Sequence, residues 1–273
     1  MIKQPALLHT LPLHYLNVVG PESNFYIESE YCLESLIYRG FFNGVDCSNS
    51  ILDCGVGINA DVSQVNPTVT GDRDWAVKYF ELADILGPGV VVAPDILGCA
   101  AATRKNFQLY TEISPLRTTW MYVIQGQTIA EAEAEIEWAI ASPTVIMVGF
   151  PRVVHYYGDP VDSEALGKVR CRLIEHFFNR LVSAGMRIHI LGMNSFAELR
   201  FAAELGMSID SRIASLLAVA GLQVDPTHPL NRPKGLRVDI LQHYSVETLE
   251  LIETNVFTLN DFFDSLCPKN PLT

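Results

Sequence analysis

The chain has 273 residues, a mass of 30.3 kDa and an apolar fraction of 49%. These values exclude a mainly disordered chain and predict a large buried core. The formal net charge of −12 excludes a protein that binds nucleic acid by overall electrostatic attraction, but it is compatible with a local basic face.

The cysteines are isolated in the sequence and form no CxC or CxxC pair, so we interpret them as free thiols in a reducing compartment. The N-terminus lacks a signal-peptide pattern, and no apolar run reaches the roughly 20 residues that span a bilayer. We therefore expect a soluble cytoplasmic protein with no membrane partner. The six cysteines are Cys32, Cys47, Cys54, Cys99, Cys171 and Cys267.

Short runs of Val, Ile and Leu, bounded by Gly, Pro or Asp, alternate along the chain with segments of helical period. The runs are typical of buried parallel strands. They cover residues 14–20, 50–55, 89–95, 121–126, 144–150, 187–192 and 207–210, with a weaker candidate at 236–242. The predicted helices cover 74–86, 128–141, 162–184, 195–205, 211–220, 245–255 and 259–266.

Thr128 and Ser195 are expected helix N-caps, and Glu131 follows Thr128 at the spacing of a capping box. Seven or eight βα units in series predict an α/β fold, a TIM (β/α)8-type barrel formed as a single domain by residues 1–273. The chain has no GxGxxG after its first strand and no GxxxxGK[ST], which disfavours the common nucleotide-binding folds. The role of 221–273 is not assigned by the sequence.

Polar residues and glycines stand where the predicted strands end, which is where barrel enzymes place their chemistry. Three strands end in an aspartate, one in a glutamine and two in a glycine, and together they predict an acidic, hydrogen-bonding pocket. Each aspartate alone would also suit a helix N-cap. The strand-end residues are Asp53, Asp95, Gln125, Gly149, Gly192 and Asp210.

Other barrel chemistries lack their residues. None of the six lysines lies in an apolar strand run, which disfavours a Schiff-base aldolase. The dispersed His155, His189 and His243, and the absence of an HxH pair on the first strand, disfavour a binuclear metallohydrolase, so we expect neither metal nor cofactor. Paired carboxylates suit displacement at an anomeric carbon, where one attacks the sugar and the other manages the proton of the leaving base.

The order of these motifs resembles the tRNA-guanine transglycosylase superfamily over about residues 50–220. The motifs are DCG at 53–55, PD at 94–95, QGQ at 125–127, VGF at 148–150, HILG at 189–192 and the strand end at Asp210. The family counterparts are DSGG, a strand-end Asp, QGG, a Gly-Gly turn, a Leu-Gly strand end and the nucleophilic Asp. The stretch 189–211 carries the most specific part of the resemblance.

The resemblance implies that Asp210 is the nucleophile that forms a covalent glycosyl-enzyme intermediate, and that Asp53 is the general acid/base. It implies that a guanine-like base is recognised at the next strand ends and around a Gly-bearing turn. The base-binding residues would be Asp95, Gln125, Gly126, Gly149, Phe150 and Gly192.

The chain departs from the family's tRNA enzymes because it has no CxCxxC zinc motif and is shorter. It looks like the compact zinc-less phage and bacterial paralogues that insert 7-deazaguanine derivatives into DNA. The expected partners are therefore a nucleic acid, DNA favoured over tRNA, and a free 7-deazaguanine base, and a homodimer is compatible with the family. Candidate nucleic-acid contacts, each also readable as ordinary surface charge, are Arg104, Lys105, Arg152, Arg212, Arg232 and Lys234.

Two alternatives of other classes are compatible with the sequence. One is a non-catalytic family member that binds nucleic acid or acts as a scaffold. The other is a nucleoside N-glycosidase that hydrolyses the same type of bond. Exchange of labelled guanine into a polymer distinguishes these three functions.

Overall fold

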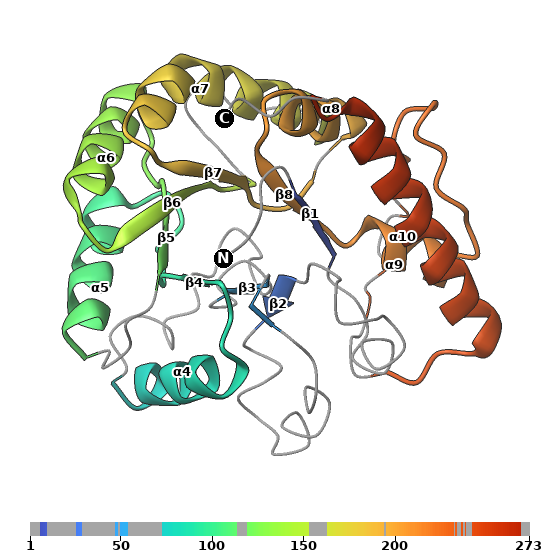
Figure 1. The fold of residues 1–273 in the computed structure, drawn as a ribbon, viewed down its shortest axis with the longest axis horizontal. Coiled ribbons are helices and arrows are strands. Elements are labelled where there is room, and N and C mark those ends of the chain that lie inside the picture. The colour runs from blue at the N-terminus through green and yellow to red at the C-terminus, as the bar shows by residue number, and fades with distance from the viewer. Residues whose placement is uncertain are drawn as a thin grey trace.

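Eight short strands pair side by side in one parallel sheet, in the order β1-β8-β7-β6-β5-β4-β3-β2 (Figure 1). The structure is a computed structural model and describes residues 6–9, 26–28, 47–48, 50–53, 73–113, 119–152, 163–193, 195–231, 233, 236, 238 and 242–268. The strands are β1 (Ala6–His9), β2 (Tyr26–Glu28), β3 (Ile51–Asp53), β4 (Val90–Val92), β5 (Trp120–Val123), β6 (Val145–Phe150), β7 (Arg187–Ile190) and β8 (Ser208–Ser211).

The sheet curls so that its strands surround a central space, and helices cover its outer face (Figure 1). In the described part of the chain no pairing joins β1 to β2, so the sheet forms an open half-barrel there rather than a closed cylinder. The helices are α4 (Arg73–Leu86), α5 (Ala100–Ile113), α6 (Ile129–Ala141), α7 (Ser163–Ser183), α8 (Phe196–Glu204), α9 (Ile213–Val219) and α10 (Val246–Leu266).

Six predicted strands, from β3 to β8, are confirmed with bounds that are shorter or shifted by a residue, and the α/β class with them. The predicted strand at 14–20 lies outside the described residues, and β1 and β2 were not predicted. The described residues of 236–242, which are 236, 238 and 242, are not in a strand.

Two of the helix predictions need correction. The helix α5 was not predicted, because polar residues share its buried face: Thr103 and Asn106 are buried beside Phe107 and Tyr110. The predicted pair of helices at 245–255 and 259–266 is one helix, α10. Asn255 does not interrupt α10, because its side chain accepts from the N–H of Val224 and donates to two backbone carbonyls.

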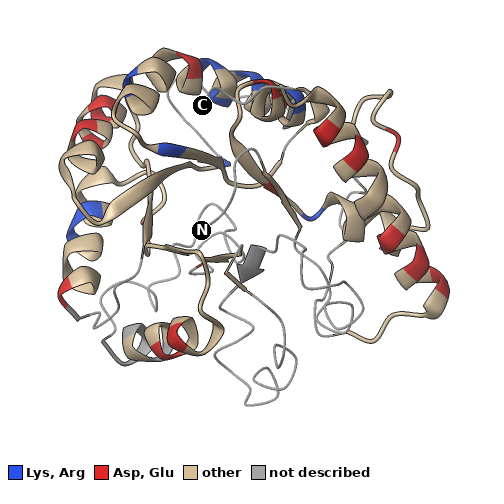
Figure 2. Cartoon of the chain, in the orientation of Figure 1, with Lys and Arg blue, Asp and Glu red and all other residues tan. Residues whose placement is uncertain are grey.

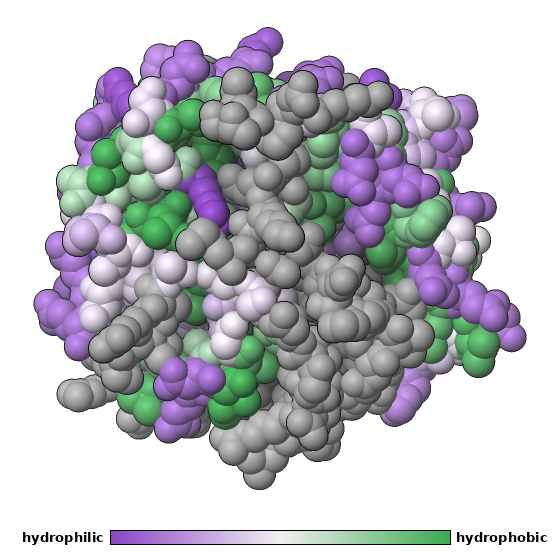
Figure 3. Space-filling model, viewed as in Figure 1, coloured by the Kyte–Doolittle hydropathy of each residue, from purple (hydrophilic) through white to green (hydrophobic). Residues whose placement is uncertain are grey.

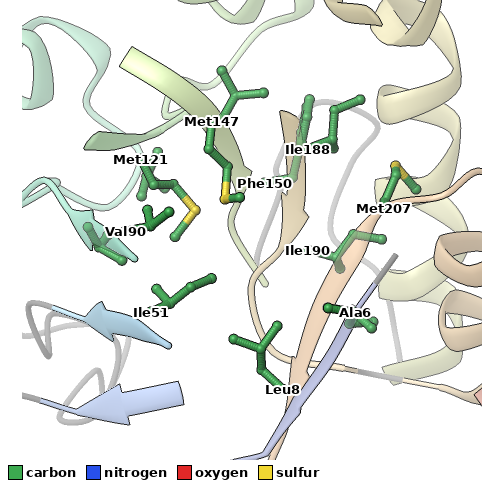
Figure 4. Close-up of a cluster of buried hydrophobic side chains, with 14 of the residues drawn as sticks. Ala6, Leu8, Ile51, Val90, Met121, Met147, Phe150, Ile188, Ile190 and Met207 are labelled. Carbon is green, nitrogen blue, oxygen red and sulfur yellow. The ribbon is translucent and has the colours of Figure 1, made fainter. Parts of the chain in front are cut away.

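The core has one part inside the curl of the sheet and another between the sheet and its helices. Figure 4 shows Leu8, Ile51, Val90, Met121 and Met147 gathered on the inner side. On the outer side, the buried Trp120 meets Phe80 and Phe107 edge to face, with ring centroids 5.6 and 5.8 Å away. Such a core fixes the strands, and therefore the positions of the residues at their ends.

Hydrophilic residues cover much of the outer helices on the face seen in Figure 3, while hydrophobic residues show between them nearer the middle. None of the helices that the structure describes combines the length and the apolar character needed to cross a bilayer.

Candidate functional site

Asp210 is a buried carboxylate held by one of its two oxygens. It lies in β8 and is 6% exposed. Its Oδ1 accepts a 2.7 Å hydrogen bond from the N–H of Gly192, and Nε2 of His189 lies 3.1 Å from the same oxygen. Two groups from the end of β7 therefore fix the orientation of this side chain.

Gly192 can donate to Asp210 because the chain turns sharply after β7. Its φ of +68° lies in the left-handed region, which glycine adopts without the steric penalty of a Cβ. A Cβ at this position would approach Cδ of Arg152 to 3.6 Å, an ordinary contact, so the backbone conformation is what requires glycine.

Arg170 of α7 also stabilises the turn after β7. Its side chain is fully buried, and it donates to the carbonyls of Leu191 and Gly192 at 2.5 Å each. Its Nε also donates to Glu198 of α8 at 2.7 Å. A buried ion pair thus fastens the carboxyl end of β7 to two helices, with Gly192 between it and Asp210.

Asp95 and Gln125 form a second buried pair, at the ends of the neighbouring strands β4 and β5. Nε2 of Gln125 donates to Asp95, and its Oε1 accepts from the N–H of Gly98 at 2.9 Å. Both ends of the Gln125 amide are therefore engaged within the protein, and the amide orients Asp95. Gly126 follows directly and is also buried.

Asp53 ends β3, where it is partly exposed. Residues that pair in register in a parallel sheet point to the same face, and alternate residues of a strand share that face. The register links one face from strand to strand through Ile51–Val90, Val92–Met121, Met121–Met147, Gly149–His189 and His189–Ser208.

Asp53 lies two residues after Ile51, and Asp210 lies two residues after Ser208. Both aspartates therefore face the inside of the curl, the side on which Ile51 lies in Figure 4. Because all strand pairs are parallel, both also stand at the same edge of the sheet, the carboxyl edge. The topology thus gives the two acids a shared face and a shared end.

Gly149 and Phe150 lie within β6 and not in a turn after it, which corrects the expected Gly-bearing turn. The carbonyl of Gly149 accepts from Ile124 at 2.8 Å. A Cβ on Gly149 would come within 3.0 Å of the side chain of Leu191 and 3.1 Å of that of Met121. Phe150 is fully buried. Close packing therefore accounts for glycine at this position.

The predicted basic contacts occupy different surroundings. Arg104 forms an ion pair with the buried Glu135 and lies over the ring of Trp138, so it joins α5 to α6. Lys105 is exposed on α5. Arg232 and Lys234 lie outside the described residues.

Glu135 also accepts from the hydroxyl of Tyr122. Burial raises the pKa of Tyr122, and the hydrogen bond to Glu135 raises it further. Arg104, Glu135 and Tyr122 therefore form a polar contact between the helices and the outer face of the sheet.

Arg152 and Arg212 lie nearer to Asp210: Arg152 stands two residues after β6 and interacts electrostatically with Asp210, and Arg212 directly follows β8. Loss of hydration lowers the pKa of Arg152, and the positive charges of Arg170 and Arg212 lower it further, while Asp210 acts in the opposite sense. The carboxyl end of β8 therefore combines a buried carboxylate with neighbouring guanidinium groups.

Sequence reasoning missed His189 and Arg170 as site residues. His189 was considered only as a possible metal ligand, and Arg170, inside a predicted helix, was given no role. The available signal was the alternation of RIHI at 187–190, which puts two polar residues on the inward face beside the strand of Asp210.

Among the described residues, no group of three or more His, Cys, Asp or Glu side chains is placed to hold a metal ion. A search against models of protein families and a search of curated proteins each find no match to this chain.

Proposed function

We propose that this chain is a transglycosylase that exchanges guanine in a nucleic acid, DNA in preference to tRNA, for a 7-deazaguanine base such as 7-cyano-7-deazaguanine. Its frame would be a TIM barrel closed between β1 and β2, in a cytoplasmic enzyme compatible with a homodimer. The single observation that carries the proposal is the shared face and edge of Asp53 and Asp210, with Asp210 held in one orientation. The motif order that resembles the tRNA-guanine transglycosylase superfamily supports it.

In the first half-reaction, a lone pair of the Asp210 carboxylate forms a bond to C1′ of the target nucleoside. The C1′–N9 bond breaks, and its electron pair leaves with the guanine, which takes a proton from the carboxyl group of Asp53. The product is a glycosyl ester of Asp210, and the polymer stays attached to the protein. A covalent intermediate divides one difficult displacement into two easier ones.

In the second half-reaction, Asp53 removes a proton from the incoming 7-deazaguanine. The base nitrogen then bonds to C1′, and the C1′–O bond breaks with its electron pair returning to Asp210. Both displacements invert C1′, so the configuration of the sugar is retained. The exchange consumes no oxidant, reductant or nucleotide.

Asp95 would bind the donor edge of a guanine-like base, since a carboxylate accepts hydrogen bonds from ring N–H and exocyclic amino groups. Gln125 orients that carboxylate through the bond already formed between them. Arg152 and Arg212 would contact the phosphates on either side of the extruded nucleotide, because they follow β6 and β8 at the same edge.

The test is incubation with radiolabelled guanine and either duplex DNA or bulk tRNA, followed by counting of the precipitated polymer. We expect label in DNA with the wild-type protein and none with Asp210→Asn, which has no anionic nucleophile. Asp53→Asn should slow exchange at least about 100-fold, the usual contribution of a general acid/base, while base binding remains. Asp261→Asn, a change on the exposed face of α10, is the matched control and should exchange at the wild-type rate.

Other outcomes would assign other functions. Label in tRNA alone would move the substrate from DNA to tRNA. Release of base with a new reducing sugar and no label in the polymer would indicate an N-glycosidase. Binding without either reaction would indicate a scaffold, and retained exchange in Asp210→Asn would refute the role given to Asp210.

A further inference from the structure

His189 lies between the carboxylate of Asp210 and the hydroxyl of Ser208. Its Nε2 is 3.1 Å from Oδ1 of Asp210, and its Nδ1 is 2.9 Å from Oγ of Ser208. The imidazole is fully buried, so its orientation is set by these contacts and by packing. Ser208 and Asp210 lie two residues apart on β8, on the face to which His189 points.

The proton positions follow from what each group can donate. An ionised carboxylate only accepts, so Nε2 must carry the hydrogen that it shares with Asp210. In a neutral imidazole Nδ1 is then an acceptor, and the Ser208 hydroxyl donates to it. The same hydroxyl has a weaker alternative acceptor in the carbonyl of Ile188 at 3.3 Å. By donating to Nδ1, Ser208 would favour the tautomer that donates to Asp210.

We propose that His189, with Ser208 behind it, is a positioning residue that assigns the two oxygens of Asp210 to different tasks. The N–H groups of His189 and Gly192 both occupy Oδ1, which leaves Oδ2 as the oxygen that attacks C1′. This inference rests on the proposed transglycosylase function and adds to it the identity of the attacking atom.

The arrangement also acts on the glycosyl ester. Once Oδ2 is bonded to C1′, Oδ1 becomes the carbonyl oxygen of the ester. When the C1′–Oδ2 bond breaks in the second half-reaction, negative charge returns to the carboxylate, and two donors already aimed at Oδ1 stabilise it. Donors that are in position before the reaction stabilise negative charge as it develops in the transition state.

The charged groups near the pair come from three strands. Asp210 belongs to β8, Arg187 precedes His189 by two residues on β7, and Arg152 follows β6. Gly149, which pairs with His189 from β6, adds no charge.

The kinetic test compares variants of His189 and Ser208 in the guanine exchange assay. We expect His189→Leu to lower kcat about 100-fold with KM for the nucleic acid within about threefold, because a donor to the nucleophile is lost. His189→Gln, whose amide N–H reaches the position of Nε2, should recover most of that loss. The kcat of Ser208→Ala should lie between those of His189→Leu and His189→Gln. The surface variant His176→Gln is the control for loss of a histidine.

A merely structural role would raise KM and lower thermal stability without rescue by glutamine. If His189→Leu fails to fold, Ser208→Ala and His189→Gln decide, and a wild-type kcat in Ser208→Ala would overturn the proposal. A second readout is independent of activity: the 15N shifts of His189 at pH 7.5 should report the Nε2–H tautomer, and the Nδ1–H tautomer would overturn it.

The two proposals fail in different ways. If the wild-type protein incorporates no label into either nucleic acid, the proposed function falls. If the wild type exchanges guanine and His189→Leu matches its kcat, only the role of His189 falls.

Discussion

At the scale of single residues, the site depends on what meets one oxygen of Asp210. Gly192 and His189 reach that oxygen from the end of β7, and the pairing of β7 with β8 is what brings both of them to Asp210. From its place at a strand end, Gly192 was expected to bind the base. In the structure, its contact is with the carboxylate.

Gly192→Ala tests this contact against a control with the same backbone strain. Gly192 and Gly221 have φ of +68° and +70°. A Cβ would make only an ordinary 3.6 Å contact at Gly192 and none within 4 Å at Gly221, so both alanine variants should lose about 1–2 kcal/mol of stability. We expect only Gly192→Ala to lower exchange as well, because only this turn orients Asp210. Urea unfolding and guanine exchange measure the two effects, and equal activity of both variants would contradict the prediction.

The buried side chain of His9 makes the stability of the folded protein depend on pH. Its Nε2 donates to Asn260 of α10 at 2.8 Å, and its buried Nδ1 has no partner among the described residues. Burial lowers the pKa of His9 from 6.5 to about 4. Between these two pH values, His9 is therefore protonated in the unfolded chain and neutral in the folded protein.

The contribution of neutral His9 is therefore complete above pH 6.5 and is lost as the pH falls toward 4. The wild-type protein should be about 2 kcal/mol less stable at pH 5 than at pH 7.5 from this group alone. Urea unfolding at both pH values measures the change, and His9→Gln should remove that part of it. An unchanged pH dependence in His9→Gln would contradict the assignment.

At the scale of elements, α7 and α8 hold the end of β7 through Arg170 and Glu198. Arg170→Met leaves Glu198 buried without its partner, which should cost about 3–5 kcal/mol. Adding Glu198→Gln should recover part of the loss, because the uncompensated charge is removed while the Ser195 N–H can still be capped.

Arg180→Met is the matched control on the same helix. Arg180 pairs with Glu133 and Glu137 on the surface, and we expect little change in stability from its loss. Urea unfolding measures all three variants. A double variant less stable than Arg170→Met would contradict the buried-charge argument.

At the scale of the whole molecule, the net charge of −12 is distributed unevenly. Figure 2 shows acidic residues along α10 and on α6, and the first of these helices carries Glu247, Glu250 and Glu253. A polyanion would be repelled there, and it would find guanidinium groups at the carboxyl edge near β6 and β8. Local charge, rather than total charge, is what a nucleic-acid substrate would meet.

Most of the elements were predictable because they depend on local patterns. The apolar runs between Gly, Pro and Asp gave six of the strands, and the expected N-caps are confirmed. Thr128 accepts from the N–H of Glu131 at 3.2 Å, and Ser195 forms a full capping box with Glu198. The strands β1 and β2 and the helix α5 were not predicted, because their apolar periodicity is short or interrupted by buried polar residues.

The sequence by itself determined the α/β class, six of the strands and the acids at their ends, since strand alternation, capping and punctuation are encoded within a few neighbouring residues. Only the tertiary structure decided that β7 lies beside β8, and with it that His189 and Gly192 meet Asp210 and that Arg170 holds their turn. Such contacts join residues about 20 positions apart. Their geometry is set by strand register and helix packing, which are properties of the assembled core and not of any local stretch of chain.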